Sequence, residues 1–129
     1  ATADDGDSDD EDTTDEKRAT TTEENFIQLS SEQQWQELME KESRPVVGYF
    51  TGSWCKPCKA TTPHLLELSK QHRNVLFVSV DAAKFTSIHE EQEVFALPTI
   101  KVYKFGKVQD STTGHDAAAI ITLVAKAAA

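Results

Sequence analysis

Cysteine is scarce in this chain: only Cys55 and Cys58 occur in 129 residues. A zinc ion normally takes four Cys or His ligands, and the four histidines are scattered without the spacing of a zinc finger. We therefore expect no metal, unless two chains share a site. A disulfide between the two cysteines would close a very short loop, and short loops gain the least stability from a cross-link. The two thiols are then either inert or redox-active.

Long apolar runs and clustered basic residues are also missing. No run approaches the roughly 20 apolar residues of a membrane-spanning helix, and no apolar signal peptide opens the chain. We therefore expect no membrane span and, without a basic patch, no nucleic-acid partner. The first residue is Ala rather than Met, so a removed targeting segment would leave no trace. We expect an intracellular monomer in the cytoplasm, or in a mitochondrion or another organelle after such removal.

Negative charge is gathered in residues 1–24, which hold eleven acidic residues, two basic residues and no aromatic residue. The net charge of this segment, −9, equals that of the whole chain, so residues 25–129 are neutral overall. Such a segment cannot bury enough apolar surface to offset the entropy of ordering. We expect a largely disordered acidic tail over 1–24, serving either as a solubilising spacer or as a docking segment for a basic partner. The folded domain is expected to span 25–129.

Hydrophobic periodicity from residue 25 onwards predicts alternating strands and helices. The expected strands are 25–30, 45–50, 75–80, 98–105 and 108–111, and the expected helices are 31–42, 57–70, 90–96 and 117–129. In the last helix we expect Ile120, Ile121 and Val124 to face inwards. Alternation favours parallel strands with right-handed crossovers, and the last two strands form an antiparallel hairpin. The fold class is therefore α/β, a mixed sheet with helices on both faces in three layers (α/β/α).

The position of the cysteine pair favours redox chemistry. Cys55 lies between the strand 45–50 and the next helix, so we expect it to be exposed at a helix N-terminus. Unpaired backbone N–H groups and the helix dipole favour an anion there, in this case a thiolate. Cys58, one turn into the helix, lies close enough to attack a mixed disulfide formed at Cys55. Thiol–disulfide exchange is therefore the favoured chemistry.

The segment 54-WCKPC-58 resembles the active-site motif of the thioredoxin family, usually Trp-Cys-Gly-Pro-Cys. The resemblance extends over residues 25–129, with further matches at Phe50, Pro63, Asp81, Leu97-Pro98-Thr99 and Gly114. It implies a thioredoxin fold, with Cys55 as the nucleophile and Cys58 as the resolving thiol. It also implies a cis peptide bond before Pro98 and a substrate groove lined by Trp54, Leu97, Pro98 and Gly114. The implied partners are client proteins with disulfides and a reductase or another dithiol electron donor, with no prosthetic cofactor beyond the Cys55–Cys58 disulfide.

Two positions depart from the family pattern. Thioredoxins usually carry a buried Asp in the strand before the motif, where this chain has Tyr49, and often a Lys or Glu in the third strand, where it has Phe77. Tyrosine is a poor base near neutrality, because a phenol ordinarily ionises at about pH 10. Cys58 must lose its proton before it can attack. We therefore expect a slow resolving step.

A third departure lies inside the motif, where Lys56 replaces the usual Gly and precedes Pro57. A cation beside Cys55 would favour the thiolate and make the pair more oxidising. If the lysine side chain is fully exposed, screening by solvent would leave it with little effect. Both interpretations remain open.

Three functions compete on this sequence. The first is a thioredoxin-type protein-disulfide reductase. The second is an oxidase or isomerase of an oxidising compartment, although such domains usually carry His rather than Pro before the second cysteine. The third is a thioredoxin-like binding or chaperone-type module with weak redox turnover, which the replacements at Tyr49 and Phe77 favour.

Overall fold

A computed structural model describes residues 21–23 and 25–129. Its sheet has six strands in the order β1-β2-β4-β3-β5-β6. The strands are β1 (Thr21–Glu23), β2 (Phe26–Gln28), β3 (Val46–Thr51), β4 (Leu76–Asp81), β5 (Thr99–Lys104) and β6 (Lys107–Thr113). The helices are α2 (Glu32–Lys41), α3 (Lys56–Gln71), α4 (Thr86–Glu91) and α5 (Ala117–Ala128). Within these residues, no helix is long and apolar enough to cross a membrane.

The sheet is mixed, as predicted. β2, β4 and β3 are parallel, whereas β5 is antiparallel to β3, and β6 is antiparallel to β5. The register places Thr51, at the end of β3, opposite Asp81 at the end of β4, and Phe50 opposite Thr99 at the start of β5. Three strand ends therefore meet at one edge of the sheet, where the cysteine-bearing turn leaves β3.

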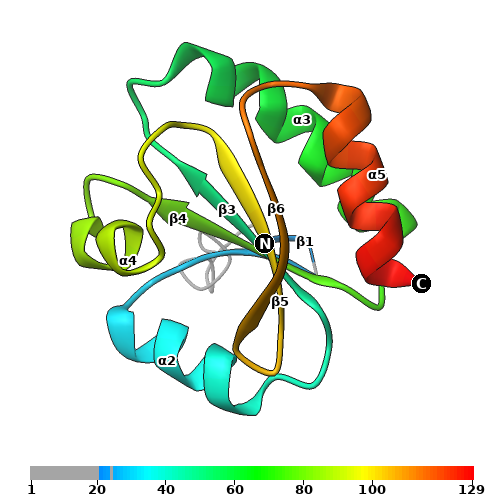
Figure 1. Cartoon of the computed structure of the whole chain (residues 1–129), viewed down its shortest axis with the longest axis horizontal. Coiled ribbons are helices and arrows are strands. Elements are labelled where there is room, and N and C mark those ends of the chain that lie inside the picture. The colour runs from blue at the N-terminus through cyan, green and yellow to red at the C-terminus, as the bar shows by residue number, and fades with distance from the viewer. Residues whose placement is uncertain (1–20, 24) are drawn as a thin grey trace, which may run out of the picture.

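The helices cover both faces of the sheet (Figure 1). On one face, α3 and α5 contribute Leu65, Leu68, Ile120, Leu123 and Val124 to a core that also holds Tyr49 and Phe77. On the other, α2 and α4 contribute Trp35 and Ile88 to a second core built around Phe50 and Tyr103. The three-layer α/β/α arrangement is therefore confirmed. The aromatic rings of the second core pack edge to face, with Trp35 5.4 Å from Tyr103 between ring centroids.

Capping side chains lie at the starts of α2, α3 and α5. Ser31 accepts a hydrogen bond from the Gln34 backbone N–H at the start of α2, and Asp116 does the same for Ala119 at the start of α5. These side chains satisfy backbone donors that a helix N-terminus leaves unpaired. At α3 the capping residue is Cys55, so the sulfur itself occupies this position.

The fold differs from the sequence-based prediction in three places. Residues 21–23 form β1, antiparallel to β2, although they were assigned to the acidic tail. Residues 1–20 and 24 lie outside the described residues, and the tail prediction for them stays a prediction. The helix expected at 90–96 is instead α4, Thr86–Glu91, which ends before Glu93 adopts a positive φ of 59°. In α5, Ile121 is 49% exposed and Leu123 is buried, because the buried stripe follows Ile120, Leu123 and Val124.

Candidate active site

The turn between β3 and α3 brings the two cysteines together. Cys55 and Cys58 form a disulfide with their Cα atoms 5.3 Å apart. The backbone N–H of Cys58 donates to the Cys55 sulfur at 3.2 Å. The sulfur of Cys55 therefore accepts one of the free donors at the helix N-terminus, where a negative charge is stabilised.

The exposure of the pair corrects one prediction. Cys55 is only 7% exposed and Cys58 1%, whereas Cys55 was expected to be exposed. The reason is that the Cys55 side chain turns back towards its own helix to cap it. Cys55 nevertheless retains more accessible surface than Cys58, so an incoming disulfide meets Cys55 first.

The residues expected to form a substrate groove surround this turn. Trp54 is 62% exposed, and its ring lies over Gly52, where an added Cβ would be 2.9 Å from the ring. The peptide bond between Leu97 and Pro98 is cis, as the resemblance implied. The Gly114 backbone N–H donates to the Pro98 carbonyl at 2.8 Å, and Gly114 has a φ of +101°, which favours glycine.

These contacts place Pro98 next to Gly114, and Trp54 next to Gly52. Leu97 is half-buried next to Pro98. A single groove formed by all four predicted residues stays a prediction.

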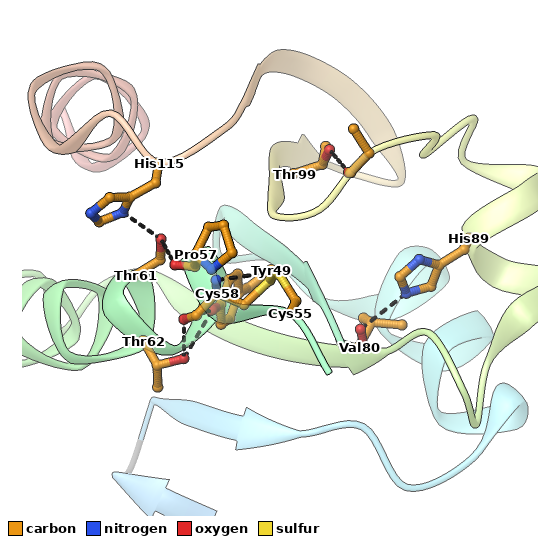
Figure 2. The surroundings of a disulfide bond; sticks show 11 residues. Tyr49, Cys55, Pro57, Cys58, Thr61, Thr62, Val80, His89, Thr99 and His115 are labelled. Atoms are coloured by element: carbon orange, nitrogen blue, oxygen red, sulfur yellow. Dashed lines mark hydrogen bonds between the residues drawn. A yellow bond between two sulfur atoms is a disulfide. The ribbon is translucent and has the colours of Figure 1, made fainter. Parts of the chain in front are cut away.

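Tyr49 is buried beneath the pair, and its hydroxyl is directed at the backbone. The hydroxyl donates to the Cys58 carbonyl at 2.7 Å and lies 2.9 Å from the Thr62 hydroxyl. Thr62 also donates to the Cys58 carbonyl, at 3.0 Å. Figure 2 shows the two side chains converging on Cys58. This arrangement holds the first turn of α3 on β3 and leaves the phenol bonded to a carbonyl and a hydroxyl.

Phe77 stands where the family often has a charged residue, and its surroundings are apolar. Its ring is fully buried and stacks on Phe26, with 6.1 Å between ring centroids. It belongs to the same core as Tyr49. No carboxylate therefore stands at either position where the family usually keeps charge.

A cleft of about 420 Å³ opens beside Cys58. Its lining includes Tyr49, Thr62, Asp81, Lys59 and Lys84. Cys58 itself lines this cleft, with 1% of its surface exposed. Within the described part of the chain, no group of three or more His, Cys, Asp or Glu residues could hold a metal ion.

Lys56 is the first residue of α3, and its side chain is exposed. An exposed cation is well screened, which favours the weaker of the two interpretations of its effect on Cys55. Pro57 follows it in the first turn, where the missing N–H of proline leaves no helical hydrogen bond unmade.

Sequence reasoning missed three polar side chains near the cysteines: Thr61, Thr62 and His115. Thr61 is fully buried, and its hydroxyl lies 2.7 Å from Nδ1 of His115. The two residues are 54 positions apart, so no local pattern could have paired them. The adjacent threonines three and four residues after Cys58 were the one available signal.

Comparisons with known proteins agree with this geometry. The family model described as Thioredoxin matches residues 26–126. Thioredoxin 1 of Plasmodium falciparum is 30% identical over 101 residues, which cover 78% of this chain and 96% of that protein. The mitochondrial thioredoxin-2 of Schizosaccharomyces pombe is 38% identical over 77 residues, which cover 60% of this chain and only 58% of that protein. A crystal structure of a thioredoxin from Nicotiana alata superposes with a TM-score of 0.76 at 25% identity, covering 81% of this chain and 94% of that one.

Proposed function

This chain belongs to the thioredoxin family, and from that premise we propose that it is a thioredoxin-type thiol–disulfide oxidoreductase that reduces disulfides in client proteins. One observation carries the proposal: the Cys55 sulfur caps α3 and accepts the Cys58 N–H while paired with the Cys58 sulfur. A sulfur in this position is stabilised as a thiolate, which is both nucleophile and leaving group in disulfide exchange. Its relatives in Schizosaccharomyces pombe, Plasmodium falciparum and Nicotiana alata are themselves named thioredoxins, which does not favour a binding module or an oxidase.

The reaction proceeds in two exchanges. The Cys55 thiolate attacks one sulfur of the client disulfide and releases the other client sulfur as a thiolate. Cys58 then loses its proton and attacks the Cys55 sulfur. This attack forms the Cys55–Cys58 disulfide and releases the remaining client sulfur as a thiolate. Two electrons pass to the client, and its thiolates take up protons from solvent. A reductase or another dithiol donor restores the reduced pair, so the cycle needs no prosthetic group.

The resolving exchange is the slow one in this chain. The proton of Cys58 has no carboxylate acceptor at Tyr49, whose hydroxyl is bonded to the Cys58 carbonyl. The cleft beside Cys58 supplies solvent as the alternative acceptor. Water is a weaker base than a carboxylate, so the mixed disulfide persists longer than it would with a carboxylate beside Cys58.

Membership of the thioredoxin family implies client proteins that carry disulfides. The oligomeric state and the compartment are further parts of the proposal. The protein acts as a monomer in the cytoplasm, with a mitochondrion as the alternative because one relative carries that name. Imaging of the full-length protein in its own cells distinguishes these compartments. Sedimentation of the purified chain tests the monomer.

The proposal is tested by reductase-coupled reduction of insulin, together with a redox titration of the pair. We expect turnover by the wild type, none by Cys55→Ser, and a trapped mixed disulfide with Cys58→Ser. Absence of any acceleration over the donor alone, with a correctly folded wild type, would show that the chain is not a reductase.

A further inference from the structure

Thr61 is the centre of a short hydrogen-bond chain beside the active site. Its side chain is fully buried, and its hydroxyl donates to the Pro57 carbonyl at 3.0 Å. The same oxygen lies 2.7 Å from Nδ1 of His115. A hydroxyl has one proton to donate. With that proton directed at the Pro57 carbonyl, we assign Nδ1 of His115 as the donor to Thr61.

These hydrogen bonds connect two segments that border the cysteines. Pro57 lies between Cys55 and Cys58 in the first turn of α3, whereas His115 lies in the connection from β6 to α5. Figure 2 shows His115 reaching Thr61 from outside the sheet, on the α3 side of the disulfide. The residue before it, Gly114, donates its backbone N–H to the Pro98 carbonyl at 2.8 Å. Two consecutive residues thus join this connection both to the cis-proline segment and to the cysteine-bearing helix.

We propose that His115 is a positioning residue for client binding: its hydrogen bond to Thr61 fixes how far Gly114 and Pro98 stand from the first turn of α3. The proposal rests on the proposed reductase function and specifies which contact sets the shape of the client site. A client segment that docks between these elements needs their spacing fixed beforehand, because ordering them on binding would cost affinity. A small disulfide that touches only Cys55 does not need that spacing.

The hydrogen bond to His115 is not needed to satisfy the buried hydroxyl of Thr61, because that hydroxyl already donates to the Pro57 carbonyl of its own helix. What the contact with His115 adds is a link between α3 and a segment 54 positions away in the sequence. The neighbouring exposed His64, whose ring centroid lies 5.8 Å from that of His115, makes no side-chain hydrogen bond among the described residues. His64 therefore provides a matched control for the loss of an imidazole at this surface.

The test compares His115→Phe, His115→Asn and His64→Phe in the full chain. Phenylalanine keeps a planar ring but removes the donor, whereas asparagine places an N–H near the position of Nδ1. The loss of one neutral hydrogen bond, about 1 kcal/mol, corresponds to about a fivefold change. We expect His115→Phe to raise KM for a protein disulfide about fivefold without a change in kcat, and to leave the rate with a small aromatic disulfide unchanged. His115→Asn should restore KM to within about twofold of wild type, and His64→Phe should leave it unaltered.

Thr61→Val removes the same hydrogen bond from the other side and should give the same rise in KM, which covers the case of a misfolded His115→Phe. An unchanged KM in both His115→Phe and Thr61→Val, or equal losses with the protein and the small disulfide, would overturn the assignment. These results are distinct from failure of the proposed function, in which the wild type itself would not turn over and both proposals would fall.

Discussion

At the residue scale, the hydroxyl of Tyr49 stabilises the backbone at the position where the family usually places a proton acceptor. It donates to the Cys58 carbonyl and contacts the Thr62 hydroxyl, and no hydrogen bond joins it to a sulfur in the described residues. Because the Cys58 carbonyl is on the same residue as the resolving thiol, Tyr49 still fixes where that thiol stands. In this protein, Tyr49 therefore positions the Cys58 thiol but does not accept its proton.

Tyr49→Asp should accelerate the resolving step. A carboxylate beneath Cys58 would accept its proton, and general base catalysis typically contributes about 10²–10⁴-fold. We expect at least about a tenfold shorter lifetime of the mixed disulfide, since an unoptimised carboxylate reaches only part of that range. Rapid-mixing measurements of Trp54 fluorescence follow the step.

Tyr49→Phe is the matched control, because it removes the hydroxyl without adding a base. It should leave resolution at least as slow as in the wild type and lower the stability by about 1–3 kcal/mol, since the buried partners of the hydroxyl lose a bond. If Tyr49→Asp folds and its mixed disulfide persists as long as that of Tyr49→Phe, the missing carboxylate does not limit the reaction.

Lys56 allows a second prediction at this scale. Lys56→Gln removes the cation beside Cys55 and should raise the pKa of the Cys55 thiol, because the thiolate loses an attractive charge. The lysine is exposed, so we expect a rise of less than about one unit that disappears at about 1 M salt, where the Debye length is about 3 Å. Titration by the thiolate absorbance at both ionic strengths measures it. A rise that persists at high salt would indicate a direct, unscreened contact.

At the element scale, the sequence predicts those strands and helices that have strong apolar periodicity or a capping residue. β3, β4 and α2 fall within one or two residues of their expected positions, because each buries a regular set of side chains. β1 was missed because its stability comes from pairing with β2, and pairing between segments leaves no local pattern. α4 was misplaced because a helix over 90–96 would have to continue through Glu93, whose positive φ does not fit a helix.

The same distinction applies to the active site. The redox role of the cysteine pair was predictable from its place at a helix N-terminus, whereas the cis bond before Pro98 was predicted only through the resemblance to the thioredoxin family. The contacts of Tyr49 with the Cys58 carbonyl and of Thr61 with His115 were not, because each joins residues whose distance in space is set by the fold. Sequence reasoning therefore identified the reacting atoms but not the groups that hold them.

His89 gives α4 a pH-dependent attachment to the sheet. Its Nε2 donates to the Val80 carbonyl at 3.0 Å, and its ring packs edge to face on Phe50. Burial lowers the pKa of His89, and the Val80 carbonyl and the Asp81 charge offset this effect only in part. The folded protein therefore binds this proton at lower pH than the unfolded chain, whose histidines titrate at about pH 6.5.

The lowered pKa of His89 determines how the stability of the protein changes with pH. As the pH falls below about 6.5, the unfolded state gains a proton that the folded state still excludes, so stability decreases until the lower pKa of the folded state is reached. His89→Gln, which can still donate to Val80, should flatten this slope whatever its effect on stability at neutral pH. Urea unfolding at several pH values between about 5 and 7.5 compares the slopes, and equal slopes in the two proteins would assign the effect to other groups.

At the scale of the whole molecule, charge is separated from the fold: residues 1–24 carry −9 and residues 25–129 are neutral. β1 runs antiparallel to β2, with Thr21 opposite Ile27, and β2 is parallel to β4, which is parallel to β3. The chain therefore enters β1 from the end of the sheet at which β3 leads to Cys55. The point at which the acidic segment joins the domain lies at the active-site end of the molecule.

The segment should therefore bias which clients are reduced. In a full-length variant with the nine acidic residues of segment 4–16 replaced by their amides, we expect peptides with acidic flanks around a disulfide to be reduced several-fold faster than by the wild type at low salt, and peptides with basic flanks several-fold slower. Both differences should vanish at about 1 M salt, since charges then interact only within about 3 Å. The rate with a small uncharged disulfide should be equal in the two proteins at every ionic strength. If the ratio of acidic to basic peptide rates is the same in both proteins at low salt, the segment does not act on client approach and the solubilising spacer is the better account of it.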